Sequence, residues 1–161
     1  MDSRRLAAGF GWGVIATIAM SAVMLAGQLT GVAPMPEPIP VAIAGQVLGD
    51  RMPQPLLMLL GALSHLAYGG FWGAVLVALT RPVTVWKGIG LGILLWLGMG
   101  LAVLPFLGWG LFGTSVTPII AGATLLLHLI YGATLGWGMD RRGSSTKARE
   151  FRPSALGTRS R

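Results

Sequence analysis

The only two histidines of this 161-residue chain, His65 and His128, stand in nearly identical surroundings. Each follows a proline by ten residues, Pro55 in one case and Pro118 in the other, within an apolar run free of charge. At a helical rise of about 1.5 Å per residue, each imidazole would lie roughly 15 Å deep, near the middle of a hydrocarbon core about 30 Å thick. The sequence therefore predicts two imidazoles at matching depth inside a membrane.

Imidazoles at that depth need partners for an N–H and a lone pair, so both rings should face protein rather than lipid. One interpretation is structural, with hydrogen bonds across the bundle to a backbone carbonyl or to hydroxyls that help to fix the helix register. A candidate mid-membrane polar site then comprises His65, His128, Tyr68 and Tyr131, with Thr124 and Ser64 as further partners.

A second interpretation is chemical. Two histidines on different helices could ligate a b-type haem axially through Nε2, or bind copper, or carry protons. The chain has no cysteine, and its apolar runs contain no Asp, Glu, Lys or Arg, so two ligands are too few for a closed zinc site. We expect no resident metal ion or cofactor, and haem b ligated by His65 and His128 remains open.

Glycines accompany both histidines at helical spacing. The steps of four residues place each histidine on one helical face with two glycines that form a G-x-x-x-G step, a sign of close helix approach in membranes. The sets are His65, Gly69 and Gly73, and His128, Gly132 and Gly136. This pattern predicts that the second and fourth spans pack against each other.

The composition places these runs in a bilayer, because 53% of residues are hydrophobic and 11% are charged. We predict an all-α transmembrane four-helix bundle, residues 1–139, with every span near the 20 residues needed for crossing. The spans are about 6–29, 55–80, 88–112 and 118–139, and tight connections at 81–87 and 113–117 should make consecutive spans antiparallel neighbours.

Weaker similarity links the first and third spans. Residues 9–13 with Met20 match residues 88–92 with Met99 in their glycine spacing, so Gly9 aligns with Gly88. Together with the histidine motif, this predicts two copies of a helical hairpin, repeated in parallel about an axis along the membrane normal.

Charge predicts the orientation. The net charge is +7, but eleven of the twelve Lys and Arg residues lie on one side of the predicted spans, with only Arg51 on the other. This is the positive-inside pattern, which places both termini in the cytoplasm and argues against nucleic acid as a partner. The basic tail, 140–161, should be disordered.

The segments between spans give fewer signals. Residues 30–54 should form an external loop with an extended, proline-rich start, followed by a short helix near 41–49 on the outer interface or, alternatively, a lid over a cavity. Pro105 lies inside the third span, where it should kink or break the helix.

The chain resembles a family of unknown function, made of small four-helix integral membrane proteins of bacteria and archaea. The resemblance covers residues 9–142 and rests on Gly13, Ala16, Thr17, Met20 and Ser21, and on the closing motif His128, Leu129, Tyr131, Gly132 and Gly136. It implies the four-helix architecture and a prokaryotic inner membrane, and it supplies no catalytic residue.

The sequence contains no G-x-S-x-G or H-E-x-x-H motif, no paired carboxylates and no phosphate loop. We therefore predict a non-enzymatic structural, assembly or interaction subunit of the inner membrane, in contact with lipid and with itself or another membrane protein. A haem-binding module and a small-solute carrier are two further hypotheses.

Overall fold

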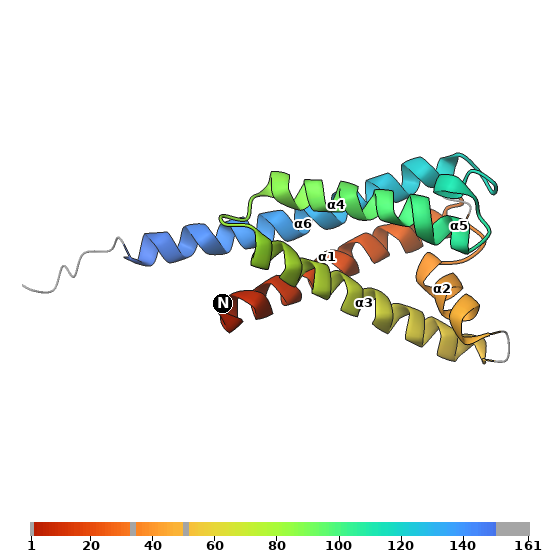
Figure 1. Cartoon of the computed structure of the whole chain (residues 1–161), viewed down its shortest axis with the longest axis horizontal. Coiled ribbons are helices and arrows are strands. Elements are labelled where there is room, and N and C mark those ends of the chain that lie inside the picture. The colour runs from red at the N-terminus through yellow and green to blue at the C-terminus, as the bar shows by residue number, and fades with distance from the viewer. Residues whose placement is uncertain (1, 33–34, 50–51, 151–161) are drawn as a thin grey trace, which may run out of the picture.

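The structure, a computed structural model, describes residues 2–32, 35–49 and 52–150. The described residues form helices and connections without strands, and four of the helices are long and apolar enough to cross a membrane. Their order is shown in Figure 1: α1 (Ser3–Leu29), α2 (Ile39–Leu48), α3 (Gln54–Leu79), α4 (Val85–Gly98), α5 (Leu104–Phe106) and α6 (Ile119–Glu150). The predicted all-helical chain with four apolar spans is confirmed.

The helix ends follow from local sequence. The Asp2 carboxylate accepts the backbone N–H of Arg4 at 3.0 Å, which satisfies one of the amides left without a partner at the start of α1. At the far end of α1, the Thr30 hydroxyl donates to the Ala26 carbonyl at 2.8 Å. α3 begins with Pro55 in its first turn, where a missing N–H removes no hydrogen bond.

The third span is interrupted where Pro105 predicts it. After α4, residues Met99–Val103 form a π-helix, and the N–H of Leu104 bonds to the carbonyl of Met99, five residues earlier. Proline lacks an N–H, and its ring clashes with the carbonyl four residues before it, so a regular α-helix cannot run through this position. The predicted irregularity is present as this π-helical turn, and the helical span continues from Val85 to Phe106.

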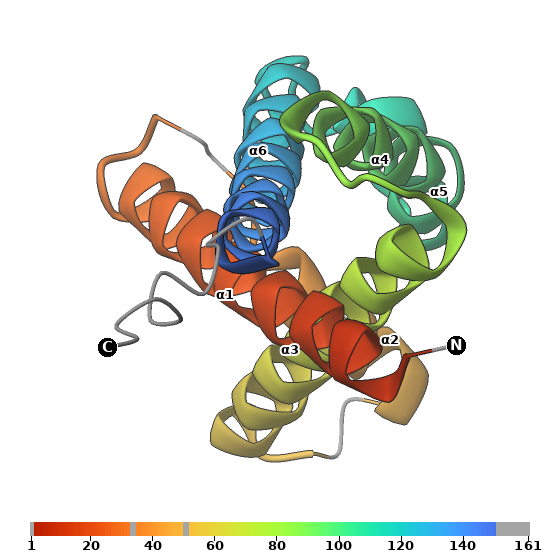
Figure 2. The same cartoon turned by 90° about the vertical axis from the view of Figure 1, so that its left-hand side faces the viewer.

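The long helices pack in two antiparallel pairs, α1 with α3 and α4 with α6, and α1 also packs along α6. Figure 2, a view along the bundle, shows the α4–α6 pair above α3. Gly69 and Gly73 of α3 contact α1, and Gly132 and Gly136 of α6 contact α4 and the residue before it. The prediction that the second span packs on the fourth through its glycines is therefore wrong, because these glycines serve contacts within each pair.

The short helix predicted near 41–49 is present as α2, and it packs against α3. Val41, Ala44 and Leu57 form an apolar cluster between the two helices. A Cβ atom on Gly61 would meet the Pro40 carbonyl, so the backbones approach closely there. α2 thus covers one end of α3.

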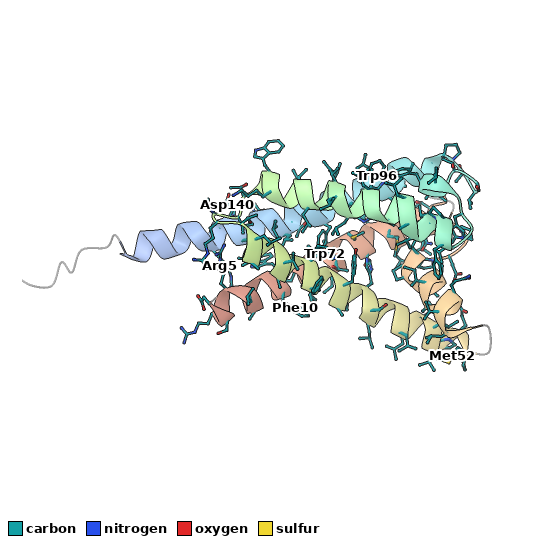
Figure 3. All side chains as sticks on the ribbon, in the orientation of Figure 1. Arg5, Phe10, Met52, Trp72, Trp96 and Asp140 are labelled. Carbon is teal, nitrogen blue, oxygen red and sulfur yellow. The ribbon has the colours of Figure 1, made fainter. Side chains whose placement is uncertain are left out.

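The largest apolar cluster draws on all four long helices. Its buried members include Ala16 from α1, Leu91 from α4, and Tyr131 and Leu135 from α6. Trp72 of α3, labelled in Figure 3, packs against them. The middle of the bundle is therefore filled by side chains.

α6 is longer than predicted. It continues to Glu150, so the disorder predicted from Asp140 onward is wrong over residues 140–150. The helix already carries the chain past the last apolar turn, and nothing in 140–150 interrupts it, since the next proline is Pro153. The rest of the predicted tail, 151–161, lies outside the described residues.

Candidate mid-membrane polar site

One hydrogen bond fixes how α3 and α6 meet in the middle of the bundle. The hydroxyl of Tyr131, a residue only 2% exposed, donates to the carbonyl of Gly69 at 2.6 Å. The two helices run in the same direction (Figure 1). His65 precedes Gly69 by four residues and His128 precedes Tyr131 by three, so both histidines lie about one turn to the same side of this bond.

His128 is held by its own helix. The residue is 9% exposed, and its Nδ1 lies 2.8 Å from the carbonyl oxygen of Thr124, one turn earlier on α6. A carbonyl oxygen only accepts hydrogen bonds, so the neutral ring carries its proton on Nδ1 and keeps a lone pair on Nε2. The sequence predicts a partner across the bundle, whereas the carbonyl found here belongs to the histidine's own helix.

His65 is held across a helix interface. It is half-buried, and its Nδ1 lies 3.4 Å from the Oγ atom of Ser21 on α1, a long hydrogen bond. Ser64, which the sequence offers as a partner, instead donates to the Gly61 carbonyl at 2.9 Å. The two histidines thus sit in matching sequence contexts but in different hydrogen-bond environments.

Sequence reasoning missed Ser21 as the partner of His65. The signal that could have found it is the stripe of small residues on the first span, at steps of four: Gly9, Gly13, Thr17 and Ser21. This stripe faces α3, because a Cβ on Gly13 would meet the Gly69 carbonyl and Thr17 lies against Gly69.

Tyr68 does not join the site. It is 51% exposed and lies edge-on to Trp72, with ring centroids 6.1 Å apart. The proposed matching roles of Tyr68 and Tyr131 therefore do not hold: Tyr131 is buried between the helix pairs, and Tyr68 is on the outside.

The four glycines predicted to pack all lie at helix contacts, within the two pairs. Gly13 meets Gly69 and Gly9 meets Gly73 in the first pair, whereas Gly88 meets Gly132 in the second. A Cβ on Gly136 would meet the carbonyl of Thr84, just before α4. If Gly69 is aligned with Gly132, as the histidine motifs require, Gly88 corresponds to Gly13. The sequence alignment of Gly9 with Gly88 is therefore wrong by one helical turn.

A family model described as a family of unknown function, DUF6789, matches residues 3–150. The chain belongs to this family. The predicted membership is confirmed, and the DUF6789 match spans all four apolar helices. No curated protein and no solved structure is similar enough to the chain to count as a match.

For a DUF6789 member with this geometry, haem between His65 and His128 does not fit. The Tyr131 side chain bridges α6 to the Gly69 carbonyl about one turn from the imidazoles, so the space between the two helices is already occupied there. The glycines that could make room face α1 and α4 instead. The candidate ligands lack the space that a macrocycle needs.

The same arrangement bears on a metal site and on a solute carrier. Among the described residues, no group of three or more His, Cys, Asp or Glu side chains is placed to hold a metal ion. A small-solute carrier needs a hydrated centre, but Leu91, Tyr131 and Leu135 pack together there. The site therefore has the properties of a hydrogen-bonded contact between helices.

Proposed function

We propose that this chain is a non-enzymatic integral subunit of a prokaryotic cytoplasmic membrane that assembles with a second copy of itself through α4. The four apolar helices support the membrane location. The polar groups at mid-membrane support a structural role, because the hydroxyl of Tyr131 and Nδ1 of His128 already bond within the chain.

Orientation follows from the charge at one end of the bundle. The N-terminus and the extension of α6 lie at the same end (Figure 1). We call it the basic end, since it also carries Arg4, Arg5, Arg81 and Lys87. By the positive-inside rule, this end faces the cytoplasm.

We also infer that the two helix pairs are copies of one hairpin. Gly13 faces Gly69 in the first pair as Gly88 faces Gly132 in the second. The shared histidine motif is what aligns the two sets. A duplicated hairpin explains why both pairs use the same kind of backbone contact.

Self-assembly is supported by the residues exposed on the outward side of α4. A Cβ on Gly90 or Gly98 would meet nothing within 4 Å, and both glycines are exposed. Leu94 of α4 is 60% exposed, and Leu101 in the π-helix that continues this span is 56% exposed. In a membrane, small residues among larger ones let another backbone approach, as Gly13 and Gly88 do inside the bundle. The outward side of α4 offers a second copy the same kind of surface.

The chain has no cysteine, so a single introduced cysteine can report whether two copies are in contact. Leu94→Cys should form a disulfide-linked dimer when native membranes are oxidised, because the same helix of a second copy would lie opposite. Gly90→Leu in that background should suppress the dimer by keeping the helices apart.

Leu63→Cys is the matched control, since Leu63 is 54% exposed but lies on α3, which takes no part in the proposed contact. It should remain monomeric at equal expression. Cross-linking of equal yield at both positions would reveal random collision, and no dimer at Leu94, Leu97 or Leu101 would contradict self-assembly through α4.

A further inference from the structure

A small hollow lies at the basic end, between the start of α1 and the end of α3. It has a volume of about 10 Å³, room for one water-sized group. Its lining is half charged and half apolar: Asp2, Arg5, Leu6, Val77, Ala78 and Arg81. The hollow is remote from the mid-membrane histidines and plays no part in the proposed assembly.

Arg5 is fixed at this hollow. Its Nη2 donates to the carbonyl of Thr80 at 2.7 Å and ties α1 to the end of α3. A guanidinium has five N–H donors in a fixed plane, so this bond leaves others for a further acceptor. Arg81 is the next residue after Thr80, so the tie brings its charge close to Arg5, and the two cations repel each other.

The local charge is positive. Asp2 contributes the one carboxylate among the lining residues, and it already accepts the N–H of Arg4 as the cap of α1. Arg4 adds another cation beside the hollow in the sequence, and Lys87 donates to the Pro82 carbonyl nearby at 2.7 Å. Asp140, labelled in Figure 3, lies toward the same end on α6. Two guanidiniums against one carboxylate leave the hollow suited to an anion.

We propose that Arg5 and Arg81 form a binding site for a phosphate group, with one phosphate oxygen entering the hollow between them. Guanidinium groups match phosphate oxygens with two parallel hydrogen bonds, which a simple point charge does not provide. The site lies where two membrane-spanning helices end, the level of lipid headgroups, so an anionic phospholipid is the expected source of the phosphate. Binding would also relieve the repulsion between the two arginines.

The test measures lipid binding to the full, detergent-purified chain by native mass spectrometry, with dioctanoyl phosphatidylglycerol as the probe. Arg5→Gln and Arg81→Gln should each raise the apparent Kd about tenfold, the loss expected for one charge-assisted hydrogen-bonded contact. Arg4→Gln is the matched control: it removes the same charge one residue from Arg5 but does not line the hollow, and it should change the Kd by no more than about twofold.

Inorganic phosphate separates the two sources. Competition by millimolar phosphate, with the same dependence on Arg5 and Arg81, would support the site and show that the acyl chains are dispensable. If phosphate does not displace the lipid probe but Arg5 and Arg81 are still required, the result would support the site and assign it to lipid headgroups. Equal losses for Arg4, Arg5 and Arg81, or no loss for any of them, would overturn the proposal. If Arg5→Gln fails to fold because the tie to Thr80 is lost, exposed Arg81 decides the outcome.

Discussion

The α1–α3 pair and the α4–α6 pair use the same backbone contact at one level and differ one turn away. At the shared level, Gly13 meets Gly69 and Gly88 meets Gly132. One turn toward the histidines, α1 places Thr17 and α4 places Gly92, whose Cβ would collide with the His128 carbonyl. Toward the histidines, backbone contact therefore continues for one more turn in α4, at Gly92. In α1 it ends at Gly13, because Thr17 places a side chain at the next turn.

This difference parallels the way in which each histidine is held. In the first pair the Thr17 side chain fills the space and bonds to the Gly13 carbonyl at 2.9 Å, and His65 reaches Ser21 one turn further on. In the second pair the backbones leave no space for a side chain at Gly92, and His128 bonds to its own helix. Nearly identical motifs thus differ in how the histidine is held: His65 bonds across to α1, whereas His128 bonds within α6.

The largest expected effects test the level that the two pairs share. Gly13→Ala and Gly88→Ala should each destabilise the chain by about 3 kcal/mol or prevent folding, because the new methyl meets a backbone carbonyl that cannot move aside. The free energy of unfolding in mixed detergent micelles, followed by circular dichroism, measures both.

The controls are glycines with open space around them, Gly11 on α1 and Gly122 on α6. Alanine there should be neutral or stabilising by up to about 1 kcal/mol, from its better helix propensity. A loss at Gly13 without a similar loss at Gly88 would break the equivalence of the two pairs.

The next largest effect concerns the level at which the pairs differ. Gly92→Ala should cost about 2 kcal/mol because its methyl meets the His128 carbonyl. Thr17→Ala should cost only about 1 kcal/mol, since it removes a hydroxyl bonded within its own helix. The same unfolding measurement ranks them, and a larger loss for Thr17→Ala would mean that the first pair, not the second, is the more tightly packed.

These contacts show where sequence reasoning about the fold succeeds and where it stops. The spans need only length and composition, and the interruption at Pro105 needs only the missing N–H, so both are predictable. The sequence does not predict which helix a glycine-lined face will contact. Residues at steps of four drift by about 40° each on a helix of 3.6 residues per turn. Across His65, Gly69 and Gly73 the direction therefore turns by about 80°, so spacing by four does not determine which neighbouring helix this face meets.

The site was less predictable than the fold for a related reason. Tyr68 and Tyr131 follow their histidines at the same spacing, yet one is 51% exposed and the other 2%. α6 packs on both α4 and α1, whereas α3 packs chiefly on α1 and α2. The central position of α6 buries Tyr131, and no local motif encodes that position.

A smaller effect tests the bond between the two pairs. Tyr131→Phe should cost about 1 kcal/mol, in the range of interhelical hydrogen bonds in membranes, because it removes the bond to the Gly69 carbonyl. Tyr68→Phe, the matched change in the other pair, should alter the free energy of unfolding by less than about 0.5 kcal/mol. Equal effects would mean that the tyrosines are equivalent after all.

The smallest energetic effect belongs to the bond that distinguishes the histidines, and nitrogen NMR reads it better than unfolding does. Ser21→Ala should cost no more than about 0.5 kcal/mol, since the bond to His65 is long at 3.4 Å. In a 15N-histidine spectrum it should shift only the His65 ring nitrogens. His128 should show a proton on Nδ1 in both proteins, and also in Thr124→Val, because its acceptor is a backbone carbonyl that this substitution leaves in place. A His128 ring protonated on Nε2, or one that responds to Ser21→Ala, would mean that the two histidines share one environment and that the pairs differ only in their glycines.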